Sequence, residues 1–257
     1  MWALGGLLIA FILLPLVRLV ASSSPSSLHA TAANSEIRDA ILLSLKDAAI
    51  TAVIASVFGI PLAFLLARRR VPMPRLVQAI VDLPLAVPHT VAGIALLFVF
   101  GRTGWIGSPA SHIGISFYGT QWGIIVAMLF VSLPFAVNSA RVGFEAIDPS
   151  YERAARSLGA TPGYVFRRVT LPLARRAVLT GAVLVYARSI SEFGAVVIIA
   201  YYPATAPVEI YNLFLRSGLT QSAAAAVLLL FVSLATFLVF RTLASGWDVW
   251  AIDRERG

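Results

Sequence analysis

The chain has 257 residues, of which 59% are hydrophobic and 12% are charged, and its mean hydropathy is +0.86. Because soluble domains carry about 25% charged residues, this composition excludes an ordinary water-soluble globule. The net charge of +8 does not indicate a nucleic-acid partner, since lysine occurs only at Lys46 and no basic patch interleaved with aromatic residues is present. The absence of cysteine excludes disulfides, thiolate metal sites and a cysteine nucleophile.

Long apolar runs dominate the sequence in place of amphipathic stripes. A membrane-spanning helix needs about 20 consecutive, mainly apolar residues. Six stretches meet or approach this length, which predicts an all-α, polytopic membrane protein with one transmembrane domain over residues 1–257. The predicted spans are residues 2–20, 41–67, 80–100, 122–142, 177–200 and 223–243.

Prolines in two of these spans predict kinks, and small residues after the first span raise the question of a signal peptide. Pro84 and Pro88 predict a kink or a late start in the third span, and Pro134 predicts a kink in the fourth; neighbouring helices make such prolines tolerable. The first run is followed by small residues, as in a cleaved signal peptide. However, no Lys or Arg precedes it and it is long for the apolar part of such a peptide, so we expect a retained helix.

The basic residues predict the orientation. Arginines concentrate in two loops, at residues 68–75 and 153–176, whereas the loops on the other side hold few. Cytoplasmic loops of membrane proteins are enriched in Lys and Arg, so both basic loops are expected in the cytoplasm. The sequence therefore predicts a multi-pass protein of the cell membrane, in contact with lipid, with cytoplasmic N- and C-termini.

Several missing motifs limit what the chain does alone. The outer loops are short, so capture of a dilute substrate is expected to belong to another protein. No Gly-x-x-x-x-Gly-Lys-Ser/Thr phosphate loop is present, so nucleotide chemistry is expected in a separate subunit. The three histidines are widely separated, which argues against a metal site, and we expect no cofactor in this chain.

The loop at residues 144–176 is polar but carries the signals of a helix. Asp148 is a suitable N-cap, Pro149 suits the first helical position, and Glu152 falls in the first turn, where a carboxylate complements the helix dipole. Gly159 suits a left-handed terminator. The predicted helix lies outside the membrane with two alanines on its surface. It is either a docking surface for a partner or an amphipathic helix resting on anionic lipid.

This loop resembles the EAA loop of the permease subunits of ABC importers. The motif reads Glu-Ala-Ala, three residues, Gly, nine residues, then an aliphatic residue, any residue and Leu-Pro. The chain departs from it at Arg153, which stands at the motif's Glu position, although Glu152 is adjacent. The resemblance implies that the predicted helix couples the chain to a cytoplasmic ATPase. The implied coupling residues are Glu152, Arg153, Ala154, Ala155, Leu158, Gly159, Leu171 and Pro172, and Val169 completes the match.

The resemblance extends over about residues 41–241. Two segments, residues 82–93 (DLPLAVPHTVAG) and 188–195 (RSISEFGA), together with Tyr201-Tyr-Pro203, are similar to molybdate/tungstate permeases of the archaeal type, and sulfate permeases share the Glu-Phe-Gly segment. This implies an ATP-driven importer of an oxyanion. Its implied parts are two copies of this chain around the path, a dimer of cytoplasmic ABC ATPases that bind ATP and magnesium, and an external substrate-binding protein.

Two charged residues fall near the middle of the predicted fifth span. Arg188 and Glu192 each cost about 2.5–3.5 kcal/mol there, so both are expected to face the interior of the bundle and to have partners. Arginine before glutamate is the less favourable order for a helix pair, so local helix stability does not explain them. They either line a gate in the translocation path, together with Phe193 and Gly194, or form a static structural pair. His89 is more typical of a hydrogen-bonded structural residue than of a ligand.

Two rival functions remain weaker. An ion-coupled secondary transporter would use Arg188 and Glu192 for coupling but would leave the cytoplasmic helix without a purpose. An intramembrane enzyme lacks support, because the spans contain no nucleophile elbow, His-Glu-x-x-His or paired carboxylates.

Overall fold

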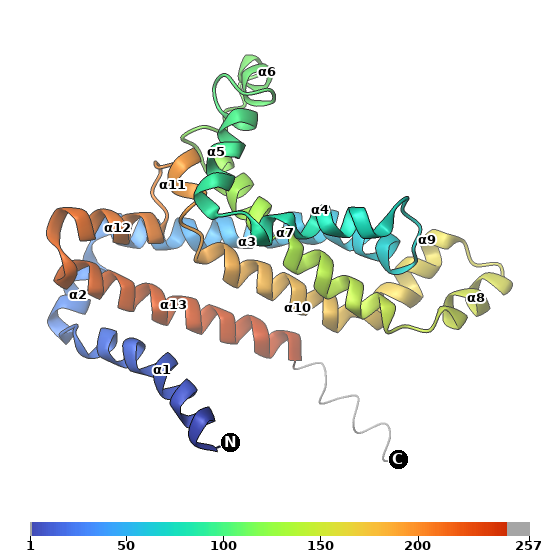
Figure 1. Cartoon of the computed structure of the whole chain (residues 1–257), viewed down its shortest axis with the longest axis horizontal. Coiled ribbons are helices and arrows are strands. Elements are labelled where there is room, and N and C mark those ends of the chain that lie inside the picture. The colour runs from blue at the N-terminus through green and yellow to red at the C-terminus, as the bar shows by residue number, and fades with distance from the viewer. Residues whose placement is uncertain (1, 246–257) are drawn as a thin grey trace.

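The computed structural model describes residues 2–245, and every regular element in this range is helical, as the all-α prediction requires (Figure 1). The elements are α1 (Trp2–Ala21), α2 (Pro25–Ala33), α3 (Ser35–Ala67), α4 (Pro74–Ala86), α5 (His89–Phe100), α6 (Gly107–His112), α7 (Gln121–Glu145), α8 (Pro149–Ser157), α9 (Pro162–Val165), the π-helical turn η1 (Phe166–Thr170), α10 (Leu171–Ile190), α11 (Val196–Ile199), α12 (Ala206–Ser217) and α13 (Leu219–Ser245).

About six spans were predicted, and the described residues agree. Five helices are long and apolar enough to cross a membrane, and a bent pair raises the number to six if it is counted as one span. The five are Leu4–Ala21, Ser35–Ala67, Gln121–Glu145, Pro162–Ile190 and Leu219–Thr242, and the bent pair is Pro74–Ala86 with His89–Phe100. The predicted cytoplasmic C-terminus falls in residues 246–257, which lie outside the described residues.

Helices α3, α7 and α10 form the centre of the bundle, and small residues let them approach closely. A Cβ atom added at Gly59 would lie 3.3 Å from Val137 Cγ2, and one added at Gly181 would lie 3.3 Å from the Cα atom of Ala136. Close backbone contacts of this kind are the usual way in which membrane helices gain packing energy.

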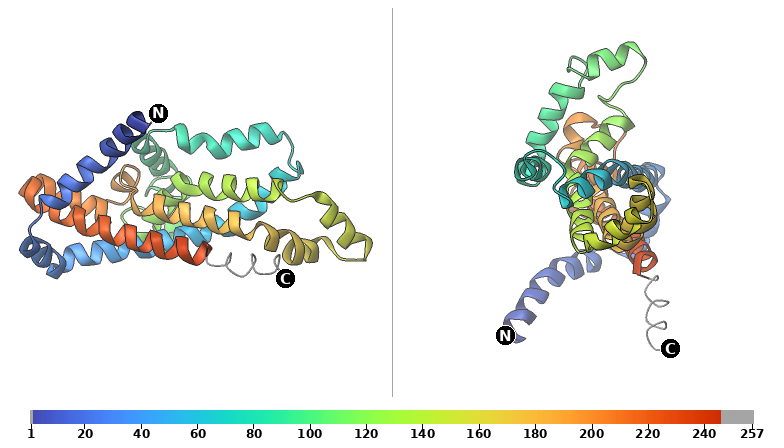
Figure 2. Two further views of the ribbon diagram at one scale, coloured as in Figure 1. Left: turned by 90° about the horizontal axis from the view of Figure 1, so that it is seen from below. Right: turned by 90° about the vertical axis from the view of Figure 1, so that its right-hand side faces the viewer.

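The third predicted span is not one continuous helix. Its axis turns by 114° between α4 and α5, at Val87 and Pro88. Pro88 has no N–H to continue the helix and disfavours a helical conformation at the residue before it, which explains a break at this point. Helix α5 leads away from the bundle and α6 lies at its far end (Figures 1 and 2). By contrast, α4 continues through Pro84 and α7 through Pro134.

The fifth predicted span also differs from the structure. Residues 177–200 were expected to form one helix, but α10 ends at Ile190 and residues 191–195 separate it from the four-residue α11. The side chain of Glu192 accepts a hydrogen bond from the backbone N–H of Ala195 at 2.9 Å, and Ser191 Oγ donates one to the carbonyl oxygen of Arg188. Local side-chain hydrogen bonds of this kind compete with the helical pattern and favour the break.

The two ends of the bundle are distinct. Helices α8 and α9 lie at one end of the long axis, next to the end of α3, and α2 and α12 lie at the other (Figure 1). Helix α1 stands apart from the centre of the bundle (Figure 2), and none of its apolar window is buried within the protomer. A surface so apolar requires lipid or another protein to cover it.

Candidate functional site

Helix α8 forms as its sequence predicts. The side chain of Asp148 accepts a hydrogen bond from the N–H of Ser150 at 2.7 Å, Pro149 occupies the first turn, and Gly159 adopts φ = +89° just after the helix ends. The backbone N–H of Ser150 stabilises the ionised carboxylate and holds the pKa of Asp148 below its ordinary value. The helix therefore has a fixed start and a fixed stop.

The outer face of α8 is exposed at the end of the bundle. Arg153 and Ala154 are exposed, Ala155 is half-buried, and Leu158 is 89% exposed. Leu158 therefore leaves an apolar side chain uncovered on this face of the protomer. Of the other predicted coupling residues, Gly159 is exposed, and Leu171 and Pro172 begin α10, where Leu171 is half-buried and Pro172 exposed.

Glu152 does not share this exposed face. It is 4% exposed, and its Oε1 atom lies 2.7 Å from Nη2 and 2.9 Å from Nε of Arg68. Thr170 donates to the same oxygen at 3.2 Å. The carboxylate thus faces into the protein and joins α8 to the end of α3 and to η1.

Arg68 extends this joint to α7. Its Nη1 donates to the carbonyl oxygen of Phe144 at 2.9 Å, and Nη2 donates to that of Ile147 at 3.3 Å. Its guanidinium carbon lies 5.9 Å from the ring centroid of Phe64, and Phe64 packs against Phe166 with 5.0 Å between ring centroids. We call Arg68, Glu152 and Thr170 the α8 joint. Sequence analysis had used Arg68 only as a topology signal, and an arginine directly after an apolar span offered no further sign of its burial.

Arg188 and Glu192, predicted to form either part of a gate or a static pair, do form an ion pair, and His89 contacts both of them. Arg188 Nη2 lies 2.8 Å from Glu192 Oε2 and 2.9 Å from His89 Nε2, and His89 Nδ1 lies 3.2 Å from the same carboxylate oxygen. Glu192 is 1% exposed. We call Arg188, Glu192 and His89 the junction triad, because it joins the end of α10 to the first residue of α5. Its members do not share a helix, since Glu192 lies beyond the end of α10.

Phe193 and Gly194 complete the junction. The ring of Phe193 packs against Tyr211, with 5.1 Å between centroids. A Cβ atom added at Gly194 would lie 2.7 Å from Cβ of His89, so only glycine allows this approach without a shift. His89 was expected to be a hydrogen-bonded structural residue. Nothing in the sequence indicated that Arg188 and Glu192 would be its partners, because they lie 99 or more positions later in the chain.

A polar network missed by sequence analysis links α4 to α7. Gln78 Nε2 donates to Asp82 Oδ2 and to Asn138 Oδ1, and Asn138 Nδ2 donates to Asp82 Oδ1, each at 2.7 Å. These hydrogen bonds tie α4 to α7, although Gln78 Oε1 is buried without a hydrogen-bond partner in the described residues.

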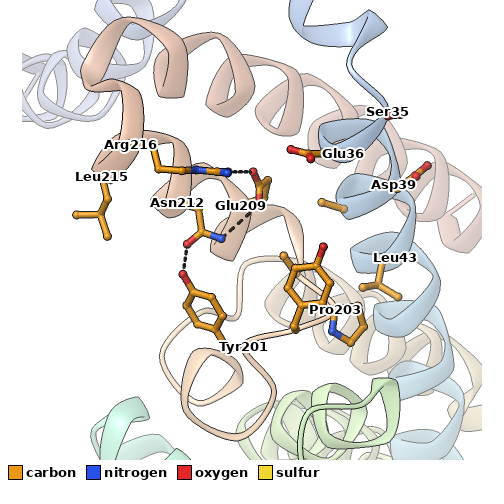
Figure 3. A pocket seen from close by; sticks show the side chains of 13 residues that line it. Ser35, Glu36, Asp39, Leu43, Tyr201, Pro203, Glu209, Asn212, Leu215 and Arg216 are labelled. Atoms are coloured by element: carbon orange, nitrogen blue, oxygen red, sulfur yellow. Dashed lines mark hydrogen bonds and ion pairs between the residues drawn. The ribbon is translucent and has the colours of Figure 1, made fainter.

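A cavity of about 610 Å³ lies at the end opposite α8, between the start of α3, the segment after α11, and α12 (Figure 3). Tyr201 donates to Asn212, Asn212 to Glu209 at 3.2 Å, and Arg216 to Glu209 at 2.6 Å. Glu36 and Asp39 line its other side. In residues 2–245 no group of three His, Cys, Asp or Glu side chains is placed to hold a metal ion.

Comparison with known proteins places this geometry in a family. The sequence profile of the family described as binding-protein-dependent transport system inner membrane component matches residues 55–248. The chain is similar to the molybdate/tungstate transport system permease protein of Thermococcus kodakarensis, with 41% identity over 243 residues that cover 94% of this chain and 93% of the relative. It is also similar to the molybdenum transport system permease protein of Mycobacterium tuberculosis, with 38% identity over 235 residues that cover 90% and 88%.

Solved structures share the fold. A chain of a bacterial alginate ABC transporter, in complex with an alginate-bound periplasmic protein, has a TM-score of 0.71 at 18% identity and covers 95% of this chain and 92% of its own. A chain of the MetNI methionine ABC transporter, in an inward-facing conformation, has a TM-score of 0.66 at 19% identity and covers 82% and 95%. The fold, the helix outside the apolar spans and the sequence match agree, and the chain belongs to the family of binding-protein-dependent transport system inner membrane components.

Proposed function

We propose that this chain forms the translocation path of an ATP-driven importer of molybdate or tungstate. A relative named as a molybdate/tungstate permease aligns over 94% of the chain. This alignment is the main support for the proposed substrate class. The relative named as a probable sulfate transport system permease is less similar, at 34% identity, and makes sulfate the second candidate.

The exposed face of α8 is the proposed contact with a cytoplasmic ATPase. It combines an exposed apolar residue, Leu158, with exposed arginines, and it projects beyond the bundle at the end where α3 and α7 finish. ATP and magnesium would bind to that partner. The arginines around this end support an orientation in which α8 and the N-terminus of α1 are proposed to face the cytoplasm and the cavity lined by Tyr201 to face outside.

Two further partners belong to the proposal. Residues 2–245 contain at most six spans, and the apolar surface of α1 is uncovered within the protomer, so a second copy of this chain is proposed to complete the path. In the described part of the chain, the connections at the end opposite α8 hold only short helices and no separate domain that could capture an anion from dilute solution. An external substrate-binding protein is therefore proposed to deliver the oxyanion.

Leu158→Glu is expected to abolish assembly with the ATPase subunit while leaving the permease folded. The side chain is almost fully exposed, so the change costs no core packing, but it places a charge in the proposed interface. Co-purification with the ATPase, followed by ATPase stimulation in proteoliposomes by binding protein loaded with molybdate, measures the effect. Leu219→Glu, also exposed but at the opposite end, is the matched control for ATPase co-purification.

The same proteoliposomes separate the candidate functions. Import that requires ATP and survives collapse of the proton gradient supports an ABC importer, whereas the reverse pattern supports an ion-coupled transporter. Stimulation by sulfate-loaded but not molybdate-loaded binding protein would replace the proposed substrate.

A further inference from the structure

The junction triad offers donors that the protein itself does not use. The guanidinium of Arg188 has five N–H groups. Nη2 forms hydrogen bonds with Glu192 and His89, and Nη1 has one long contact of 3.4 Å to Ser191 Oγ. Nε and the second hydrogen of Nη1 have no partner within residues 2–245. The side chain of Arg188 is 25% exposed, so these free donors have access to space outside the protomer.

The buried carboxylate lies behind these donors. Glu192 is 1% exposed; its Oε2 atom accepts from Arg188 and His89, and its Oε1 atom accepts from the N–H of Ala195. It neutralises Arg188 when the junction is empty, which avoids the cost of an unpaired charge inside an apolar environment. An anion that approaches from outside meets the arginine and not the carboxylate.

The first turn of α5 adds further donors. Pro88 provides no side-chain cap for α5, and Thr90, the residue after His89, is exposed with a hydroxyl that makes no hydrogen bond in the described part of the chain. Gly194 packs against one side of this turn, since a Cβ atom there would lie 3.5 Å from the backbone nitrogen of Thr90, and its missing side chain keeps the approach to the turn narrow but unfilled. Free N–H groups at the N-terminus of a 12-residue helix favour negative charge.

We propose that Arg188, Thr90 and the first turn of α5 bind a tetrahedral oxyanion in transit, with His89 and Glu192 holding the guanidinium in position. The proposal rests on the proposed function and assigns the site at which the cargo pauses in the path. The donors come from two helices that are each broken at this point, and such breaks in transporters commonly hold anionic substrates. Glu192 keeps the empty site electrically neutral, so binding is weak enough to allow release.

Direct binding of molybdate to the permease–ATPase complex in nanodiscs, without binding protein, tests the proposal. Bound molybdenum is measured by equilibrium dialysis and elemental analysis, with sodium chloride at matched ionic strength as the control anion. Saturable binding is expected. Arg188→Lys should weaken it about tenfold or more, because lysine loses the planar set of donors. Thr90→Val should weaken it about threefold to tenfold through loss of one neutral hydrogen bond.

Thr180→Val, an exposed threonine of α10 away from the junction, is the matched control and should bind as the wild type. Co-purification with the ATPase checks that each variant is assembled. Absence of saturable binding in a wild-type complex that imports molybdate would overturn the site and leave the proposed function standing. Binding that is equal in wild type, Arg188→Lys and Thr90→Val would also overturn it. A wild-type complex that imports no oxyanion with any binding protein would instead overturn the proposed function.

Discussion

Arg68→Met is expected to abolish stimulation of the partner ATPase by loaded binding protein. The change leaves the carboxylate of Glu152 buried without its cation and removes the donors to the carbonyl oxygens of Phe144 and Ile147. Removing one member of a buried ion pair typically costs about 3–5 kcal/mol. Thermal unfolding of the permease measures the loss of stability, and ATPase stimulation in proteoliposomes measures the loss of coupling.

A double variant separates stability from coupling. In Arg68→Met with Glu152→Met, no buried charge is left unpaired, so thermal stability should rise above that of Arg68→Met, short of the wild type only by the cost of the carbonyl oxygens of Phe144 and Ile147 that lose their donors. Stimulation should stay low, since α8 is no longer tied to the ends of α3 and α7. Arg75→Met, an exposed arginine of α4, should behave as the wild type. Normal stimulation in the double variant would show that the α8 joint contributes stability alone.

Gly194→Ala is expected to reduce import strongly without preventing assembly. The added methyl group would lie 2.7 Å from Cβ of His89, so α5 and the end of α10 must separate and the contact between His89 and Arg188 must lengthen. Overpacking of this kind costs about 1–3 kcal/mol, enough to change the ratio of closed to separated junctions by about fivefold to 150-fold. Uptake of molybdate into proteoliposomes is the measurement.

Gly163→Ala is the matched control for this variant. A Cβ atom added at Gly163 has no neighbour within 4 Å, and the backbone there is not left-handed. The Gly163→Ala variant should therefore take up molybdate at the rate of the wild type. Equal uptake in Gly194→Ala and Gly163→Ala would mean that the close approach of α5 and α10 does not limit transport.

The parts of the fold that could be predicted are those set by local physics. Length and apolarity located the spans, and Asp148, Pro149 and Gly159 were enough to place both ends of α8. These signals act over a few residues, through capping hydrogen bonds, the fixed φ of proline and the tolerance of glycine for positive φ.

The parts that could not be predicted depend on distant partners. Residues 190–200 are almost continuously apolar, but Glu192 turns its side chain to the backbone N–H of Ala195 and to His89, which lies 103 positions earlier in the chain. The burial of Arg68 likewise depends on carbonyl groups of α7 and on Glu152. A single sequence gives the charge of such residues but not their neighbours.

Helix α10 connects the α8 joint to the junction triad as one continuous helix. It starts next to Thr170 of the α8 joint and ends just after Arg188 of the junction triad, and its 20 residues span about 30 Å. Gly181 lies at its midpoint, where a Cβ atom would lie 3.3 Å from the Cα atom of Ala136 of α7, so the two backbones are close there. If α10 pivots at this contact, a rotation of the helix by about 10° moves its two ends by about 2.5 Å in opposite directions, given the rise of 1.5 Å per residue. A movement of the α8 end of α10 toward α7 would therefore be accompanied by a movement of its junction end in the opposite direction.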